Sequence, residues 1–532
     1  MLQADTITID RLFPSAPSRV EVVPRRKKKV AIVALYALEN SGVRHITSIL
    51  KHHGWAAHLL FFKQWYNNRV PNPTEREIEL LCELVVREQY DVIGLSFGSP
   101  YWLIAREVTE RIRAVKSDAL IVWGGLHVTL SPETCMPYAD VLCVGEGEYP
   151  FMELMERLER GEDYYDVPNL WIHKGDEVIK NEVQPLHNSL DELPFRDLGG
   201  EDKYFIDYDK VTMHDPELDN REFRVHASRG CPYRCAYCYN SSLAEVYPTG
   251  NYQRLRSVGD VIEEIKHARG IMKNMTRVKF DDDTFVFPRE WLEEFCERYP
   301  VEVGLPFYIL LTPQAAKEGN LAMLKKAGLK HIQMGIQSAS EDEAKEVFGR
   351  TSTNAEVTRF AKMNRRLKIQ ITYDLIVDDP LATSRDKETL YTFLMGLPGP
   401  YRLFLYSLTL FPRSAVASTF IDRGISTPLD VEGYATKSFR QFRVSLDYPR
   451  SKEDRFYLAL IVLITKEFVP RSFIRACHDS EFFRENPDIL LRLSQAANLV
   501  KMAQIAAEWG MRGELSLFKI REYGSLSRMI TQ

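Results

Sequence analysis

The sequence lacks any apolar run long enough to cross a membrane. Its longest run, at 458–464, is far shorter than the roughly 20 residues that a membrane-spanning helix needs. The opening residues, MLQADTITID, also lack the apolar core of a signal peptide. We therefore expect a cytoplasmic protein with no transmembrane segment.

Cysteine is scarce, and positive charge is not in excess. Five of the eight cysteines are scattered along the 532 residues, which does not suggest a disulfide framework and fits a reducing compartment. The formal net charge of -5 gives no signature of polyanion binding, so nucleic acid is not expected as a partner. The length predicts about three domains.

The other three cysteines stand together in the stretch 228–240, SRGCPYRCAYCYN. Cys231, Cys235 and Cys238 form a C-x3-C-x2-C run, with Tyr237 just before the last cysteine. Iron–sulfur clusters normally take four thiolates, so three predict a cubane with one iron open to another ligand. The alternative is a structural zinc site, which needs a fourth ligand. His226 is the nearest candidate, at a spacing unusual for zinc.

Residues 29–160 alternate short apolar strands with amphipathic helices. Continuous apolar strands are covered on both faces, which predicts a doubly wound parallel sheet of the Rossmann-like kind. Ligands of such sheets bind beyond the carboxyl ends of the strands. Strands are predicted at 30–35, 57–62, 91–96, 119–123 and 141–144, and helices at 43–53, 74–87 and 104–115.

Glycines follow three of these strands. The segments are 96–99 (SFGS), 124–127 (GGLH) and 145–148 (GEGE). Glycines at neighbouring strand ends let a flat, bulky ligand approach the backbone. The candidate contacts are Ser96, Gly98, Gly124, Gly125, His127, Gly145, Glu146, Gly147 and Glu148.

A second alternating region covers 223–425, after a hairpin and linker at 161–222. Six strands alternating with helices predict a partial (β/α)6, TIM-like barrel with its site at the carboxyl ends of the strands. Residues 1–28 are predicted to be an N-terminal arm, and 426–532 a helical region that closes the substrate site. Barrel strands are predicted at 225–228, 277–280, 307–311, 331–335, 369–377 and 403–410, and helices at 258–267, 354–366, 453–468 and 486–509.

The cysteine run resembles the signature of the radical SAM enzymes. The stretches WGGLH at 123–127 and VGEGE at 144–148 resemble the cobalamin-binding group of that family, over about residues 29–425. The resemblance implies a 4Fe-4S cluster on the three cysteines, S-adenosylmethionine on its open iron and cobalamin beyond the first sheet. It implies S-adenosylmethionine contacts from Tyr237, Asp282, Asp283, Gln337, Ser338, Arg350 and Asp374.

Several of these assignments have alternatives. The aspartates at 281–283 would hold the ammonium group, but they could instead cap a helix ahead of Pro288. Gln337 or Ser338 would contact the methionyl or ribose part. Arg350 would pair with the carboxylate or form a surface ion pair, and Asp374 could face the substrate instead.

The first sheet departs from the group in one respect. Many cobalamin domains carry D-x-H-x-x-G after the first strand, but residues 37–42 read ALENSG. His45 lies just beyond and is out of register. We therefore expect cobalamin bound base-off with no protein histidine on its lower face. The alternative is a domain that has lost its ligand.

The resemblance implies a small-molecule substrate and an electron donor such as flavodoxin or ferredoxin. Methyl transfer to an unactivated carbon, through a 5′-deoxyadenosyl radical and methylcobalamin, is the leading expectation. The alternatives are an oxidative cyclase or rearrangement enzyme, and a non-catalytic cobalamin sensor with a structural metal. Aromatic residues after the barrel could line an apolar substrate pocket or simply pack in the core; they are Tyr434, Phe439, Phe442, Tyr448, Phe456 and Tyr457.

Overall fold

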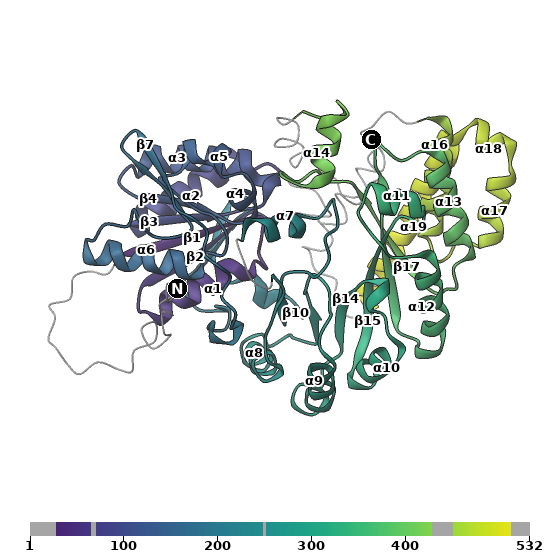
Figure 1. Ribbon diagram of the computed structural model, residues 1–532, viewed down its shortest axis with the longest axis horizontal. Helices are drawn as coiled ribbons and strands as arrows, with labels where there is room; N and C mark the ends of the chain where they lie inside the picture. Colours follow the sequence, from purple (N-terminus) through teal and green to yellow (C-terminus); the bar gives the residue numbers. More distant parts are fainter. Residues whose placement is uncertain (1–27, 65–70, 248–251, 428–450, 512–532) are drawn as a thin grey trace, which may run out of the picture.

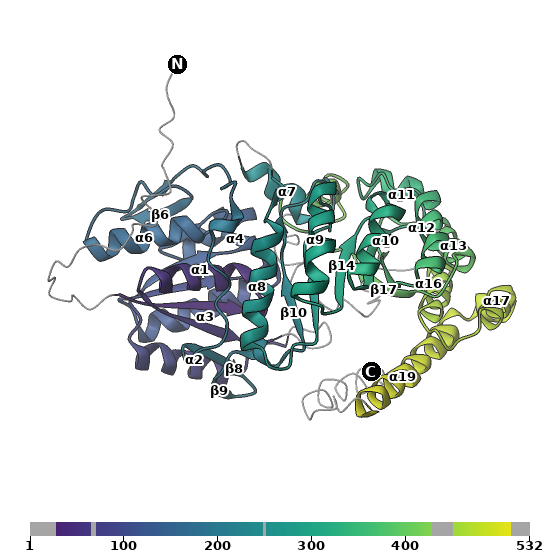
Figure 2. The same ribbon diagram turned by 90° about the horizontal axis from the view of Figure 1, so that it is seen from below.

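Two sheets lie side by side along the long axis of the molecule (Figure 1). The computed structural model describes residues 28–64, 71–247, 252–427 and 451–511. The N-terminal sheet is followed by an open barrel, and the last helices lie at the far side of the barrel (Figures 1 and 2). Among the described residues, none of the helices combines the length and apolar character needed to cross a bilayer.

The predicted doubly wound sheet is confirmed. Its five central strands are parallel and ordered β2-β1-β3-β4-β5, and each predicted strand is found within about two residues. The strands are β1 (Lys29–Leu35), β2 (Ala56–Phe62), β3 (Val92–Ser96), β4 (Leu120–Gly124) and β5 (Val141–Cys143).

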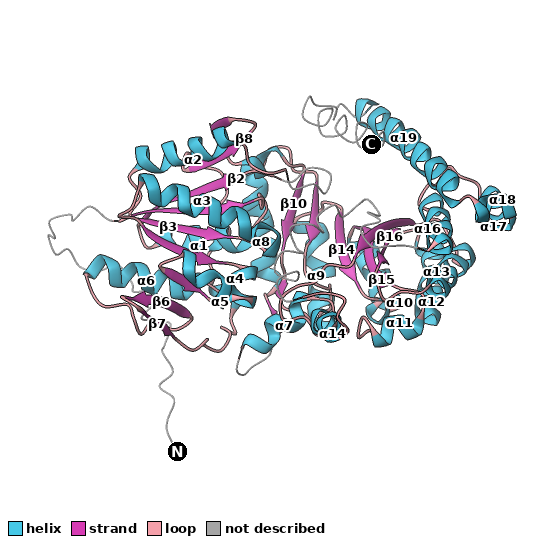
Figure 3. Cartoon of the chain, turned by 90° about the horizontal axis from the view of Figure 1, so that it is seen from above, coloured by secondary structure: helices cyan, strands magenta, loops and turns pink. Residues whose placement is uncertain are grey.

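Helices cover both faces of this sheet (Figure 3). One apolar cluster joins α2 and α3 to one face, and a second joins α1 and α6 to the other. A capping box of Thr74 and Glu77 opens α2. The helices are α1 (Ser41–His52), α2 (Glu75–Glu88), α3 (Trp102–Val115) and α6 (Glu148–Arg160).

The stretch predicted as hairpin and linker adds strands to both edges of the sheet. The hairpin expected within 161–222 is found as β6 (Leu170–Lys174) and β7 (Glu177–Lys180); β6 pairs antiparallel with β5 and with β7. At the other edge, β8 (Lys203–Asp207) pairs parallel with β2 and forms a hairpin with β9 (Lys210–Met213). Neither β8 nor β9 was predicted from the sequence.

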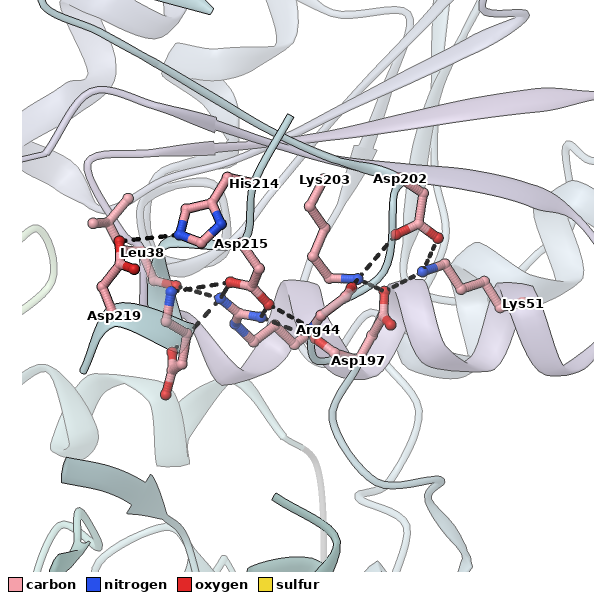
Figure 4. A network of polar contacts seen from close by, with 11 residues as sticks. Leu38, Arg44, Lys51, Asp197, Asp202, Lys203, His214, Asp215 and Asp219 are labelled. Atoms are coloured by element: carbon pink, nitrogen blue, oxygen red, sulfur yellow. Dashed lines mark hydrogen bonds and ion pairs between the residues drawn. The ribbon is translucent and has the colours of Figure 1, made fainter. Parts of the chain in front are cut away.

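A buried arginine ties α1 to this linker. Arg44 is fully buried and donates hydrogen bonds to the two carboxylate oxygens of Asp215 at 2.8 and 2.9 Å. It also donates to the carbonyl oxygens of Asp197 and Leu38, at 2.9 and 3.0 Å. Leu38 lies in the loop after β1, so this arginine holds that loop in place. Figure 4 shows that the network continues through Lys51, Asp202 and Lys203.

Replacing this arginine should destabilise the fold strongly. Arg44→Met leaves the carboxylates of Asp215 and Glu217 buried without their cation, which typically costs about 3–5 kcal/mol. Calorimetry of the cofactor-free protein should therefore show a much lower melting temperature. The control is Arg76→Met, which removes only exposed ion pairs on α2 and should leave the melting temperature nearly unchanged. Equal losses in the two variants would contradict the expectation.

The predicted barrel is confirmed as six parallel strands in chain order. Because β10 and β17 do not pair, the barrel is partial. The strands are β10 (Glu222–Val225), β13 (Arg277–Phe280), β14 (Phe307–Leu311), β15 (Leu329–Gln337), β16 (Gln370–Asp378) and β17 (Arg402–Ser407). The outer helices are α8 (Val258–Ile271), α9 (Arg289–Glu302), α10 (Glu318–Ala327), α12 (Asn354–Leu367) and α13 (Ser384–Gly396).

The first barrel strand differs from the prediction. A strand was expected at 225–228, but β10 ends at Val225. The chain then forms β11 (Ser228–Arg229), which pairs antiparallel with β12 (Arg254–Leu255) outside the barrel. The physical reason is that the amide of Ser228 donates to the carboxylate of Asp282 and not to a neighbouring barrel strand. The cysteine loop therefore leaves from this two-stranded ribbon.

The last region packs against the outside of the barrel. The predicted helices are found as α16 (Lys452–Ile464) and α19 (Pro487–Met511), and α16 packs on α13 and α19. Phe456 and Tyr457 are 0% and 1% exposed in the barrel's apolar core, so these two do not line a pocket. Tyr434, Phe439, Phe442 and Tyr448 lie outside the described residues.

Candidate functional site

The carboxyl ends of the first sheet's strands open onto a cavity of about 710 Å³. Its opposite wall belongs to the barrel and its first loops, so one cavity joins the two domains. The barrel side includes His226, Ser228, Asp281, Asp282 and Asp283. The predicted cobalamin contacts that line it are Ser96, Gly98, Gly124, Gly125, Gly145, Glu146, Gly147 and Glu148.

Two glycines allow the strand ends beside this cavity to pack closely against their neighbours. Gly125 has a φ of +94°, and a Cβ there would lie 2.8 Å from the carbonyl oxygen of Phe97 and 2.9 Å from Ser96 Oγ. Gly145 has a φ of +96°, and a Cβ there would lie 3.0 Å from Asn169 Nδ2. Both positions need glycine for conformation and for space.

His127 is not part of this surface. Its ring is fully buried on α4 (Leu126–Leu130), lies near Phe97 and Trp102, and its Nδ1 is 3.0 Å from Ser99 Oγ. Burial lowers the pKa of His127 to about 4, so the ring is neutral. The structure places it behind the strand ends and away from the other candidates.

The loop after β1 brings no histidine to the cavity. Glu39 pairs with Arg224 of the barrel at 2.5 Å, and burial raises the pKa of Glu39 to about 7 against the opposing charge of that arginine. Asn40 caps α1 through Val43. His45 Nδ1 lies 3.0 Å from the carbonyl oxygen of Pro194, and His45 does not line the cavity.

The three cysteines lie in one loop between β11 and α7 (Tyr239–Val246). The loop is held by hydrogen bonds from the amide of Cys238 to Cys235 O and from the amide of Ala236 to Phe348 O, at 3.1 and 2.9 Å. Burial raises the pKa values of Cys231 and Cys238 to about 11 and 12, and the neighbouring Cys235 raises both further. Three neighbouring thiols of this kind are the donor set of an iron–sulfur cluster, whose irons favour the thiolate form.

The structure does not support the zinc alternative. Within the described ranges, no group of three or more His, Cys, Asp or Glu side chains is placed to hold a single metal ion. A cluster differs, because its thiolates bind separate irons and lie farther apart. His226 lines the cavity; burial lowers its pKa to about 4, and its Nδ1 has no hydrogen-bond partner among the described residues.

Arg350 lies beside the cysteine loop and not on the surface. It is 8% exposed and donates to Tyr237 Oη at 3.1 Å and to the carbonyl oxygen of Gly335 at 2.8 Å. It also lies 3.7 Å from Cys235 Sγ. The alternative of a surface ion pair is therefore wrong. Arg350 joins the cysteine loop to the carboxyl end of β15.

The aspartates at 281–283 do not cap a helix, so that alternative is wrong too. Pro288 precedes α9 with no side-chain cap. Asp282 is fully buried and accepts from the amide and hydroxyl of Ser228 at 2.6 and 2.5 Å, and its Oδ2 has no partner among the described residues. Burial raises the pKa of Asp282 to about 7. Asp281 instead pairs with Lys279 at 2.6 Å.

The remaining candidates lie at the ends of β15 and β16, outside the cavity's lining. Gln337 ends β15 with a φ of +70°, and Ser338 Oγ accepts from the amide of Ser340 at 2.9 Å. Asp374 pairs in register with Gly335, accepts from Gln333 Nε2 at 2.8 Å, and burial raises its pKa to about 7. These groups therefore neighbour Arg350, while Asp282 faces the cavity.

Two arginines of this site were not predicted from the sequence. Arg229 and Arg254 line the cavity and form ion pairs with Glu146 and Glu148. The only signal for Arg229 was its place just before Gly230 and the first cysteine. Nothing local indicated Arg254.

Comparisons with known proteins agree with this architecture. Residues 27–155 match the family model of the B12 binding domain, and residues 225–393 match that of the Radical SAM superfamily. An uncharacterised methyltransferase of Pyrococcus horikoshii is 25% identical over 409 residues, 74% of this chain and 84% of that protein. The anaerobic magnesium-protoporphyrin IX monomethyl ester cyclase of Cereibacter sphaeroides is 26% identical over 329 residues, 59% of this chain and 50% of that protein.

A solved structure shows the same fold. It is that of OxsB, a cobalamin-dependent S-adenosylmethionine radical enzyme with aqua-cobalamin and S-adenosylmethionine bound. The TM-score is 0.63 at 16% identity, covering 95% of this chain and 76% of that chain.

A doubly wound sheet and a partial barrel that share one cavity, with three cysteines beside the first barrel strand, define a radical enzyme with two domains. The chain belongs to the cobalamin-binding radical SAM enzymes. The matches to both domain models favour an enzyme over a non-catalytic cobalamin sensor.

Proposed function

We propose that the protein transfers a methyl group to an unactivated carbon of a small-molecule substrate, using a 4Fe-4S cluster, S-adenosylmethionine and cobalamin. The observation that carries the proposal is the shared cavity, where flat strand ends of the B12 binding domain face the buried carboxylate of Asp282 in the radical SAM domain. A methyltransferase name for the relative from Pyrococcus horikoshii supports it. Phe456 and Tyr457 are core residues, so they no longer support the hypothesis that the substrate is apolar.

The residues of the site would divide the work as follows. When bound, the cluster with S-adenosylmethionine supplies a radical that removes hydrogen from carbon, and cobalamin supplies the methyl group. Cys231, Cys235 and Cys238 would hold three irons, and Arg350 would offset the negative charge of the thiolates from beside Cys235. Asp282 would accept a hydrogen bond from the amino group of S-adenosylmethionine.

The other proposed contacts follow the sequence assignments. Tyr237, Asp283, Gln337, Ser338 and Asp374 would border S-adenosylmethionine or substrate. Ser96 and the glycines at 98, 124, 125, 145 and 147 would carry cobalamin through the backbone, base-off and with no histidine from the loop after β1. The reductant would be flavodoxin or ferredoxin in the cytoplasm. The proposed domains are 29–160, 161–222, 223–425 and 426–532.

Labelled S-adenosylmethionine tests the proposal. The protein is reconstituted anaerobically with iron, sulfide and hydroxocobalamin, then given reductant and S-adenosylmethionine with a labelled methyl group. We expect 5′-deoxyadenosine, S-adenosylhomocysteine and label on the corrinoid. Absence of all three from protein loaded with both cofactors would overturn it.

Oxidative cyclisation or rearrangement is the second candidate. The relative from Cereibacter sphaeroides is named a cyclase and matches 59% of this chain. The same experiment separates the two, because a cyclase yields 5′-deoxyadenosine without S-adenosylhomocysteine.

Asp282→Asn should bind S-adenosylmethionine more weakly while making the ligand-free protein more stable above neutral pH. Folded Asp282 has a pKa of about 7, above its ordinary value, so the folded protein keeps a proton that the unfolded chain loses between about pH 4 and 7. Stability therefore falls as the pH rises through that window, and the variant escapes this loss. We expect a higher melting temperature than wild type at pH 8 but not at pH 4, and about tenfold weaker binding.

The matched control is Asp118→Asn, whose side chain is 75% exposed. Melting temperatures from pH 4 to 8 and equilibrium dialysis of S-adenosylmethionine measure the two effects. A variant that binds as tightly as wild type would remove Asp282 from the site.

A further inference from the structure

The acidic side chains of the VGEGE stretch pair with arginines on the barrel side of the cavity. These pairs give them a role other than contact with a cofactor. Glu148 Oε1 lies 2.6 Å from Arg229 Nη2, and Glu146 Oε1 lies 3.3 Å from Arg229 Nη1. Glu146 also accepts from both Nη atoms of Arg254, with Nη1 at 3.0 Å from Oε2. Arg254 Nη1 donates in addition to the carbonyl oxygen of His187 at 2.7 Å. Two glutamates and two arginines therefore form one charge-balanced chain of ion pairs, in the order Glu148, Arg229, Glu146 and Arg254.

We propose that Glu146 and Glu148 are positioning residues that fix the cobalamin-bearing strand ends relative to the cysteine loop. The proposal rests on the proposed function, because it assigns how that site holds its two halves together. The four residues Glu146, Glu148, Arg229 and Arg254 are called the clamp below.

The two arginines connect the clamp to the cysteine loop. Arg229 belongs to β11, and Arg254 is its register partner on β12. Arg229 is followed by Gly230 and then by Cys231. Gly230 has a φ of +82°, and a Cβ there would lie 2.2 Å from the carbonyl oxygen of Tyr252. The ribbon is thus tightly packed up to the first cysteine. The position of Arg229 therefore constrains the position of the cysteine loop.

The place of the two glutamates is equally direct. Glu146 lies between Gly145 and Gly147 in the loop after β5, and Glu148 opens α6. Since Gly145 and Gly147 line the cavity, the cofactor-facing backbone and the clamp belong to the same short loop. The carboxylates are occupied by arginine, which leaves the backbone of this loop for the corrin.

Burial makes these pairs more than surface contacts. The side chains of Arg254 and Glu148 are 4% and 6% exposed, and those of Arg229 and Glu146 are 22% and 30% exposed. Burial opposes the charge on Arg229, but Glu148 and Glu146 outweigh it and raise its pKa. Burial likewise opposes the charge on Glu146, but Arg229 and Arg254 lower its pKa. Removing one member would leave its partner charged in a desolvated place.

The test measures cofactor binding and geometry without any substrate. Glu148→Gln, Arg229→Gln and the double variant are reconstituted with iron and sulfide, titrated with hydroxocobalamin, and reduced for EPR spectroscopy. We expect each single variant to bind hydroxocobalamin about tenfold more weakly and to change the magnetic coupling between the reduced cluster and cob(II)alamin. The double variant should be no worse than the worse single variant, because the pair acts as one unit.

Controls separate positioning from folding. Arg289→Gln removes an exposed pair with Glu293 on α9 and should match wild type in both readouts. Iron content and melting temperature identify variants that fail to fold, and Glu148→Asp, which keeps the charge, should recover part of the coupling. Unchanged affinity and coupling in both single variants would overturn the clamp alone. Wild-type protein that binds no hydroxocobalamin would overturn the proposed function and the clamp with it.

Discussion

Cys235→Ala should abolish the cleavage of S-adenosylmethionine while leaving hydroxocobalamin binding intact. Cys235 is the middle thiol of the run and the one that contacts Arg350, at 3.7 Å. With two thiolates left, a cubane has two irons without protein ligands and is not retained. We expect iron per chain to fall to background and 5′-deoxyadenosine to fall below detection. Metal analysis and chromatography of the reaction measure these two quantities.

Hydroxocobalamin binding by the first sheet should not change in Cys235→Ala. The first sheet folds around its own apolar clusters, which contain no residue of the cysteine loop. Cys296→Ala on α9 is the matched control, because it removes a partly buried thiol outside the loop. Iron retained at wild-type level by Cys235→Ala would contradict the assignment, as would iron lost equally from Cys296→Ala.

Gly125→Ala should weaken hydroxocobalamin binding by at least about tenfold, which corresponds to roughly 1.4 kcal/mol. The left-handed backbone at Gly125 strains any other residue, and the new Cβ would lie 2.8 Å from Phe97 O and 2.9 Å from Phe97 N. Both contacts are with backbone, so the ends of β3 and β4 would have to move apart. Those ends form the flat wall on which the corrin is expected to rest. Absorbance titration with hydroxocobalamin measures the effect.

Gly161→Ala provides the matched control. Gly161 ends α6 with a φ of +69°, so alanine is strained there too, but a Cβ would meet nothing within 4 Å. The difference between the two variants therefore reports the steric contact with Phe97. Equal effects on hydroxocobalamin affinity would show that backbone strain alone, and not the shape of the strand ends, limits binding.

The sequence predicts most strands of both sheets because each strand leaves a local pattern. The strands β13 and β14 were predicted with their observed bounds, since FYILL is a short apolar run and RVKF alternates charged with apolar residues before three aspartates. The strand β8 was missed because KYFID carries charges at both ends and lies in a segment rich in glycine and acidic residues. The ribbon of β11 and β12 was missed because strands of two residues leave no periodic signal.

The candidate site was predicted in outline and not in its contacts. Motifs located the strand ends and the cysteine loop, but the direction of each side chain depends on long-range packing. The helix α4 begins at Leu126, one residue before His127, and this turn of helix directs the ring of His127 into the apolar layer. Glu146 reaches Arg254, which is 108 residues away in the chain, and no local pattern encodes that pairing. Arg350 lies beside the cysteine loop, and its partners are a sulfur, a phenol and a carbonyl oxygen, none of which a local pattern indicates.

The strands at the two rims of the first sheet bear on how the protein can be divided. A fragment that stopped at residue 160 would lose β6 and β7 at one rim and β8 and β9 at the other. It would also lose Asp215, so the charge of Arg44 would lack this buried ion-pair partner in the fragment. Unpaired rims recruit other chains through their free amides and carbonyls. We therefore expect a fragment that folds on its own to extend to about residue 219, well beyond residues 27–155, which match the B12 binding domain.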